Sequence, residues 1–136
     1  MEFITAEQFL KQDKKVQEVF IDWWKPSMGD LYAWGYSDER ENDLHKLQAC
    51  TSELVIELTN DNKGVNEGDR IPLLTEGQLR KFIESKTGAK YIELEHYLKT
   101  GYDIYIENML FEDLGNDLLQ AYWKVAVQIA KESIKH

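Results

Sequence analysis

The chain has 136 residues, of which 43% are hydrophobic, 12% aromatic and 30% charged, and its formal net charge is -9. The length fits one domain over residues 1–136, and the apolar content excludes a disordered chain. The negative charge argues against direct binding of DNA or RNA, because nucleic-acid binders neutralise phosphates with cations. No apolar run is long enough to cross a bilayer, and the one cysteine, Cys50, allows no internal disulfide. We therefore expect a protein of the reducing cytosol with no membrane association.

The first predicted element is a helix. Thr5 followed by Gln8 forms a capping-box pattern, which predicts a helix start. Apolar residues at helical spacing follow, so a single amphipathic helix is expected over residues 6–24. Pro26 ends it, because the residue before a proline is forced out of helical geometry. Leu31–Trp34 is then expected to form the first strand.

The middle of the chain, Ser37–Asp69, is polar and acidic. It holds nine acidic and three basic residues, which accounts for -6 of the net charge of -9. Within it we predict a short helical turn at Leu44, Leu47 and Cys50, and a strand at Ser52–Thr59. An acidic segment of this kind either keeps the protein soluble or meets a basic protein surface.

The second half of the chain carries clearer signals. A second capping box begins at Thr75 and predicts a helix that Gly88 ends. Lys90–Leu98 and Tyr102–Leu110 alternate apolar and polar residues, which predicts an antiparallel hairpin lying on a core. Asn116 is expected to cap a last helix with a broad apolar stripe.

The predicted order is helix, strand, strand, helix, strand, strand, helix. It favours an α+β domain with a mostly antiparallel sheet of about four strands. The three helices are expected mainly on one face of that sheet.

An aromatic-rich stretch between the first helix and the first strand is a candidate binding site. Its members are Trp23, Trp24, Asp30, Tyr32 and Trp34. Adjacent helical residues point about 100° apart, so one of the two neighbouring tryptophans should be partly exposed. The rings either form a stacking platform for a base, a nucleotide or a partner side chain, or fill the core, and we favour the core. The aspartate either holds a ligand or accepts backbone N–H groups in the turn.

No catalytic or metal-binding pattern stands out. His45, His96 and His136 lack metal-ligand spacing, and His96 is expected to be structural. The sequence has no nucleophile elbow, no phosphate-binding loop and no dinucleotide fingerprint. We therefore expect a protein that is not an enzyme, with no catalytic residues, no cofactor and no metal.

Three segments together resemble a known group of proteins. They are Trp24–Tyr32, Pro72–Phe82 and Leu118–Ala126. The combination is similar to small uncharacterised proteins encoded by phages and prophages of Gram-positive bacteria. That family has no assigned activity, so no functional residue is carried over. The resemblance implies a small protein made inside an infected bacterium, where such proteins often bind host or phage machinery, including defence systems.

Two functional hypotheses follow. The first is a small acidic protein that binds a host or phage protein as a modulator or inhibitor, using the exposed aromatics and the acidic residues Glu39, Glu41 and Asp43. The alternative is a protein that binds or sequesters a small nucleotide-like ligand in the aromatic stretch. Exposed aromatic rings would also be compatible with a homodimer.

Overall fold

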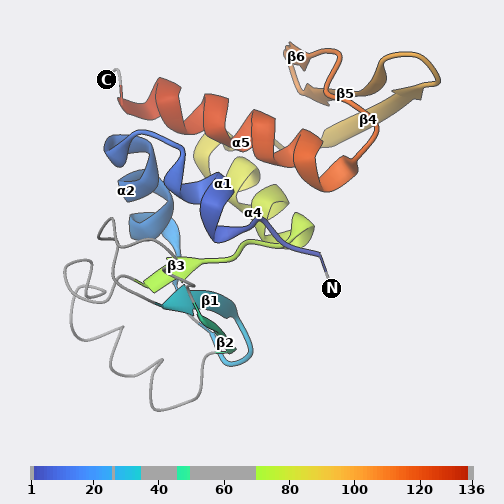
Figure 1. Ribbon diagram of the computed structural model, residues 1–136. Coiled ribbons are helices and arrows are strands. Elements are labelled where there is room, and N and C mark those ends of the chain that lie inside the picture. The colour runs from blue at the N-terminus through green and yellow to red at the C-terminus, as the bar shows by residue number, and fades with distance from the viewer. Residues whose placement is uncertain (1, 26, 35–45, 50–69, 135–136) are drawn as a thin grey trace. The chain divides into compact units, whose positions relative to one another are not determined.

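The computed structural model of the chain describes residues 2–25, 27–34, 46–49 and 70–134 (Figure 1). The chain divides into two compact units, an N-terminal unit of Thr5–Leu74 and a C-terminal unit of Met1–Ile4 with Thr75–His136. Both contain helices and antiparallel strands, so the predicted α+β class is confirmed. The described strands form two three-stranded sheets, whereas a single sheet of about four strands was expected. The single domain over residues 1–136 stays a prediction. No helix in the described ranges is long and apolar enough to cross a membrane.

The N-terminal unit begins with two short helices, α1 (Ala6–Leu10) and α2 (Lys14–Trp23), so the prediction of one continuous helix was wrong. The capping box at Thr5 is present as predicted. The break is stabilised by the side-chain amide of Gln17, which donates to the carbonyl oxygens of Leu10 (3.3 Å) and Gln12 (2.8 Å). These hydrogen bonds satisfy carbonyl groups that the end of α1 leaves free.

Strand β1 (Leu31–Trp34) lies at the centre of the first sheet, between β2 (Lys46–Ala49) and β3 (Arg70–Pro72), and is antiparallel to both. The prediction of β1 is confirmed. The helical turn predicted around Leu47 was wrong, because this residue pairs with Ala33 in the sheet. The strand β3 was not predicted, and its proline is tolerated because β3 is an outer strand of the described sheet. The strand expected at Ser52–Thr59 lies outside the described residues.

Two long helices, α4 (Glu76–Thr87) and α5 (Leu118–Ile134), lie side by side in the C-terminal unit (Figure 1). The capping box at Thr75 and the left-handed stop at Gly88 (φ 68°) are both present as predicted. Asn116 does not cap α5. The cap is Asp117, whose carboxylate accepts the Gln120 N–H at 3.1 Å and whose carbonyl accepts the Ala121 N–H at 2.9 Å.

The helices α4 and α5 supply most of the core of the C-terminal unit. The largest fully buried side chains of α4 are Leu79, Phe82 and Ile83. Helix α5 has a broad apolar face, with nine buried residues between Leu119 and Ala130. Such a helix has to be covered on several sides to be stable in water.

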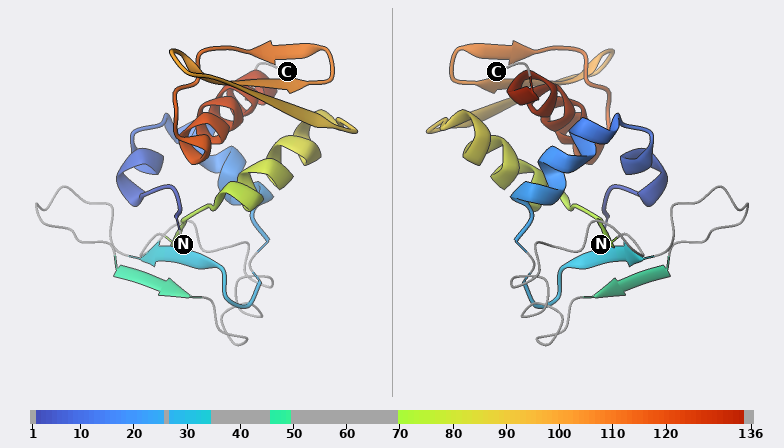
Figure 2. Two further views of the ribbon diagram at one scale, coloured as in Figure 1. Left: turned by 90° about the vertical axis from the view of Figure 1, so that its right-hand side faces the viewer. Right: turned by 90° about the vertical axis from the view of Figure 1, so that its left-hand side faces the viewer.

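The second sheet contains β4 (Ile92–Tyr97), β5 (Gly101–Ile106) and β6 (Met109–Phe111), in that order and all antiparallel. Figure 2 shows these strands beside α5. The predicted hairpin is confirmed, although the second strand ends at Ile106. The chain turns at Glu107, which has a φ of 50°, and returns as β6.

Strand β5 has hydrogen-bonded neighbours on both of its sides along its whole length. Beyond the end of β6 the chain comes back to β5, where the Tyr102 N–H donates to the Gly115 carbonyl at 2.7 Å and the Leu114 N–H donates to the Tyr102 carbonyl at 2.9 Å. Gly101 and Gly115 have φ values of 88° and 90°, and a Cβ on Gly101 would collide with the Gly115 backbone. Only glycine fits both this backbone conformation and this approach.

We expect Gly101→Ala to lower the free energy of unfolding by about 2 kcal/mol or more, because it adds left-handed strain to a backbone collision. Chemical denaturation would measure the change. Gly77→Ala is the matched control, since Gly77 lies within α4, has open space around it and should change stability by less than about 1 kcal/mol. Equal stability of the Gly101→Ala variant and the original chain would contradict this packing.

Candidate functional site

In the aromatic stretch, the carboxylate of Asp30 is hydrogen-bonded within the turn that links α2 to β1. Its Oδ2 accepts the Trp24 indole N–H at 3.2 Å and the Ser27 backbone N–H at 2.9 Å. The Asp30 N–H donates in return to the Ser27 carbonyl at 3.0 Å. The Ser27 contact confirms the interpretation of Asp30 as a turn residue that accepts a backbone N–H group, and the bond to the Trp24 indole was not predicted.

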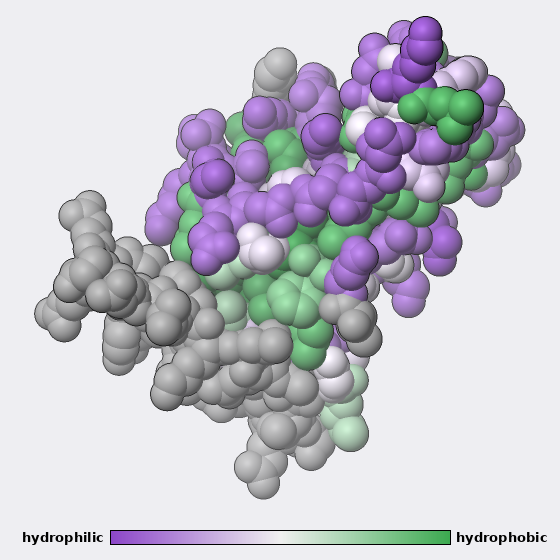
Figure 3. Space-filling view, turned by 45° about the vertical axis from the view of Figure 1, so that its right-hand side comes forward, coloured by the Kyte–Doolittle hydropathy of each residue, from purple (hydrophilic) through white to green (hydrophobic). Residues whose placement is uncertain are grey.

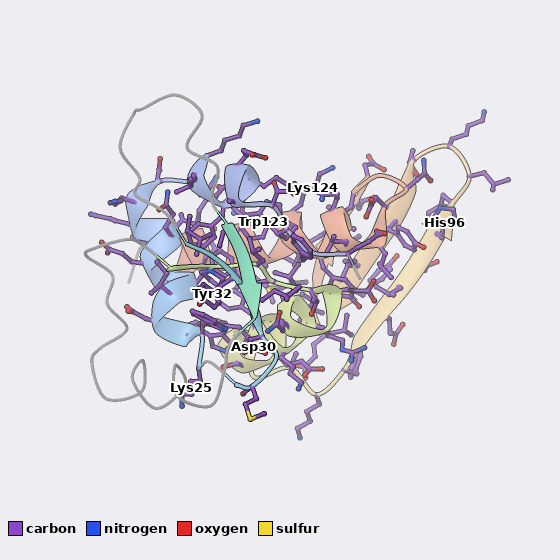
Figure 4. The ribbon with its side chains drawn as sticks, turned by 60° about the horizontal axis from the view of Figure 1, so that its bottom comes forward. Lys25, Asp30, Tyr32, His96, Trp123 and Lys124 are labelled. Carbon is purple, nitrogen blue, oxygen red and sulfur yellow. The ribbon has the colours of Figure 1, made fainter. Side chains whose placement is uncertain are left out.

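The rings of this stretch are mostly used for packing. Trp24 is 3% exposed and Tyr32 4%, whereas Trp23 is half-buried, as expected for one of two adjacent helical tryptophans. Figure 4 shows Tyr32 on the sheet close to Asp30. Trp34 pairs through its backbone with Lys46 and Arg70. The rings of Trp24 and Tyr32 are therefore too buried to stack on a ligand. The small-ligand hypothesis stays a prediction that depends on Trp23 and Trp34.

The acidic candidates Glu39, Glu41 and Asp43 lie outside the described residues. Their proposed contact with a partner stays a prediction from the sequence.

We expect Asp30→Ala to lower the free energy of unfolding by about 1–3 kcal/mol, because it leaves the part-buried Trp24 indole N–H without its acceptor. Asp30→Asn keeps an acceptor oxygen and should retain most of the stability. Glu18→Ala on the exposed side of α2 is the control, with an expected change within about 0.5 kcal/mol. Equal losses for the alanine and asparagine variants in urea denaturation would show that these hydrogen bonds are unimportant.

A second candidate site lies on the C-terminal sheet. We call it the outer sheet face: the face of β4–β6 that carries Tyr91, Glu93, Glu95, Tyr97, Asp103, Tyr105 and Leu110. The strand register places Glu93 across from Tyr105 and Glu95 across from Asp103, so these side chains share one face. Figure 3 shows the side of this hairpin that faces the viewer as mainly hydrophilic, with some hydrophobic residues among the hydrophilic ones.

Glu95 is the centre of the outer sheet face. The Tyr97 hydroxyl donates to Glu95 Oε2 at 2.9 Å. A hydrogen bond to Glu95 is also the main cause that raises the pKa of Tyr105 to about 12, and burial adds to it. The pKa of Tyr97 is raised first by its hydrogen bond to Glu95 and then by the charges of Glu95, Asp103 and Glu112. Within the described residues, every charged group that shifts these two pKa values is a carboxylate or a tyrosine.

The loop after β6 contacts the cluster formed by Glu95, Tyr97, Asp103 and Tyr105. Asp103 is 7% exposed, and its Oδ1 accepts the Asp113 N–H at 3.0 Å. This bond links the side chain of Asp103, in β5, to the loop after β6, while Glu93, Glu95 and Tyr97 stay open to solvent. The result is an exposed aromatic and acidic surface on a rigid strand pair.

The opposite face of β4 contains His96, which Figure 4 shows on the outer part of this strand. Its Nε2 lies 2.9 Å from Asn116 Oδ1, and its ring centroid lies 4.6 Å from that of Tyr102. These contacts join β4 to β5 and to the loop before α5. His96 therefore has the structural role expected from the sequence.

Two grooves lie within the C-terminal unit. One, of about 730 Å³, is lined by the apolar residues Met109, Phe111 and Ile129 and by polar residues that include Lys86. The other, of about 650 Å³, lies where α4 and α5 begin and has Glu76 and Asp117 on its wall. In the part of the chain that the structure describes, no three His, Cys, Asp or Glu side chains gather as metal ligands.

Comparisons with known proteins found no match, whether with protein-family models, with curated proteins or with solved structures. The resemblance to phage and prophage proteins stays an expectation.

The sequence predicted the hairpin that contains the outer sheet face, but this face was not among the predicted sites. Its signal is visible in the sequence, because six acidic residues and one lysine between Tyr91 and Asp113 give this segment a net charge of -5. The alternation from Tyr91 to Tyr97 also puts two tyrosines and two glutamates on one side of this segment. The predicted acidic binding residues instead came from Ser37–Asp69, which contains more acidic residues.

We expect Glu95→Ala to lower the pKa of Tyr105 from about 12 toward its ordinary value of 10.0, and that of Tyr97 as well. Because the folded-state pKa of Tyr105 is raised, its contribution to stability is fully present below pH 10 and is lost as pH rises through about 12. Titration of tyrosine ring carbons by NMR measures both pKa values, with Glu84→Ala on α4 as the control. Unchanged values in the Glu95→Ala variant would contradict the hydrogen bonds.

Proposed function

We propose that the chain is a small acidic interaction protein, not an enzyme, that binds the basic surface of another protein through its outer sheet face. The observation that carries the proposal is the exposed carboxylate of Glu95, which accepts hydrogen bonds from Tyr97 and Tyr105. In the setting implied by the resemblance, the partner is a host or phage protein in the bacterial cytoplasm. Defence proteins are among the candidates.

The chemistry of the outer sheet face suits lysine and arginine. A guanidinium or ammonium group can pair with Glu93 or Glu95 while its methylene stem lies against Tyr91 or Tyr97, which are 53% and 46% exposed. Aromatic residues beside charged groups are frequent at the centres of protein interfaces. The net charge of -9 adds attraction over longer distances and speeds the encounter with a basic partner.

Binding of this kind explains how a protein without catalytic residues would act. Basic surfaces commonly bind nucleic acids, because lysine and arginine neutralise phosphates. An acidic protein that covers such a surface competes with the nucleic acid and inhibits the partner. The acidic residues Glu39, Glu41 and Asp43 would extend the same negative charge.

Affinity capture from a Gram-positive bacterial lysate tests the proposal when three forms of the protein are compared. The original chain should retain one or more basic proteins, and the variant Glu93→Lys/Glu95→Lys should lose about nine-tenths of them, because like charges now face each other. Glu18→Lys/Glu84→Lys is the matched control, since it makes the same change in net charge at exposed positions on α2 and α4. It should retain the same proteins.

Quantitative mass spectrometry gives the readout, and thermal unfolding verifies that all three forms are folded. An equal loss of retained proteins in both variants would show that binding depends only on net charge, and would overturn the assignment to the outer sheet face. Retention of the same proteins by both variants would also overturn it.

A further inference from the structure

Among the described residues, strand β4 is the longer of the two edge strands of the C-terminal sheet. The central strand β5 is paired with β4 on one side and with β6 and the Leu114–Gly115 segment on the other. Within the described residues β4 pairs with β5 alone, and the opposite edge of the sheet is β6, which has only three residues. The six residues of β4 include no proline, so every backbone N–H of the strand is present.

Both faces beside this edge are accessible. Five of the six residues of β4 are exposed, and the sixth, Ile92, is half-buried. On the outer sheet face the edge carries Glu93, Glu95 and Tyr97, while Leu94, which is 40% exposed, lies on the opposite face with Ile92. A strand placed beside β4 would therefore have acidic and aromatic neighbours on one face and aliphatic neighbours on the other.

We infer that β4 binds an extended segment of the partner as a fourth strand of the sheet, and that this segment alternates basic with apolar residues. The inference rests on the proposed function and specifies the conformation and the sequence pattern of the partner segment that binds there. Lysine or arginine side chains at every second position would face Glu93 and Glu95. The residues between them would cover Leu94 and Ile92, while backbone hydrogen bonds to β4 supply affinity that is independent of sequence.

A second copy of the chain suits this edge less well than a basic segment. If two β4 strands paired antiparallel in the register centred on Leu94, which overlaps residues 92–96 of both copies, Glu93 of each copy would lie opposite Glu95 of the other. Like charges directly across a strand pair are destabilising. Charge complementarity therefore selects a basic occupant.

The test uses eight-residue peptides with blocked ends and measures binding to the full chain by fluorescence anisotropy. One peptide alternates lysine and valine, and a second has the same composition in two blocks. Two further peptides carry the alternating sequence with N-methyl groups either on every lysine or on every valine. N-methylation removes the N–H groups along one edge of the peptide and leaves its charge unchanged.

We expect the alternating peptide to bind about tenfold more tightly than the block peptide, and at least one methylated peptide to bind about tenfold more weakly than its parent. Amide hydrogen exchange of Ile92–Tyr97 should slow when the alternating peptide binds. Binding should fall in Glu93→Lys/Glu95→Lys and persist in Glu18→Lys/Glu84→Lys.

The other outcomes separate the two proposals. Equal binding of all four peptides, or unchanged exchange in β4, overturns strand addition, and the proposed function survives if binding still depends on Glu93 and Glu95. Absence of binding by every peptide, or equal loss in both charge variants, overturns both proposals. Protection of β4 that grows with protein concentration in the absence of peptide identifies a second copy as the occupant and overturns the inference.

Discussion

The close approach of Gly101 and Gly115 is the constraint on which the C-terminal sheet depends. It lets the chain after β6 return to the beginning of β5, so that the central strand is hydrogen-bonded on both sides from its first residue. A backbone held this way has few alternative registers, because a shift by one residue would move every side chain of the strand to the other face of the sheet. The positions of Glu95 and Tyr105 relative to each other, and hence the outer sheet face, follow from that register.

Negative charge on the outer sheet face is organised by hydrogen bonds between phenols and carboxylates. In an ordinary surface ion pair, a cation on the same protein cancels most of the field of the carboxylate. At Glu95 the described hydrogen-bond donors are the tyrosines Tyr97 and Tyr105, which orient the carboxylate and leave its charge uncancelled. An oriented, exposed carboxylate loses little conformational freedom when a cation binds, which favours association.

Local signals predicted much of the fold, because caps and stops depend on residues a few positions apart. The helix start at Thr75 and its end at Gly88 are examples. The break after α1 escaped prediction because it depends on Gln17, whose amide acts on carbonyl groups several residues earlier. The candidate site was predicted only in part. Alternation identified the face that carries Glu95, whereas the edge position of β4 depends on pairing between β5 and Gly115, which no local pattern encodes.

The tryptophans are divided unequally between the two compact units. Three of the four lie in the N-terminal unit, where the Trp24 indole donates to a carboxylate, and Trp123 in α5 is buried in the C-terminal unit. Indole emission shifts to longer wavelength when a buried ring meets water. Replacing the three N-terminal indoles with phenylalanine would leave Trp123 as an optical reporter of the C-terminal unit alone. The chain thus contains a built-in means to determine whether its two units unfold together or in sequence.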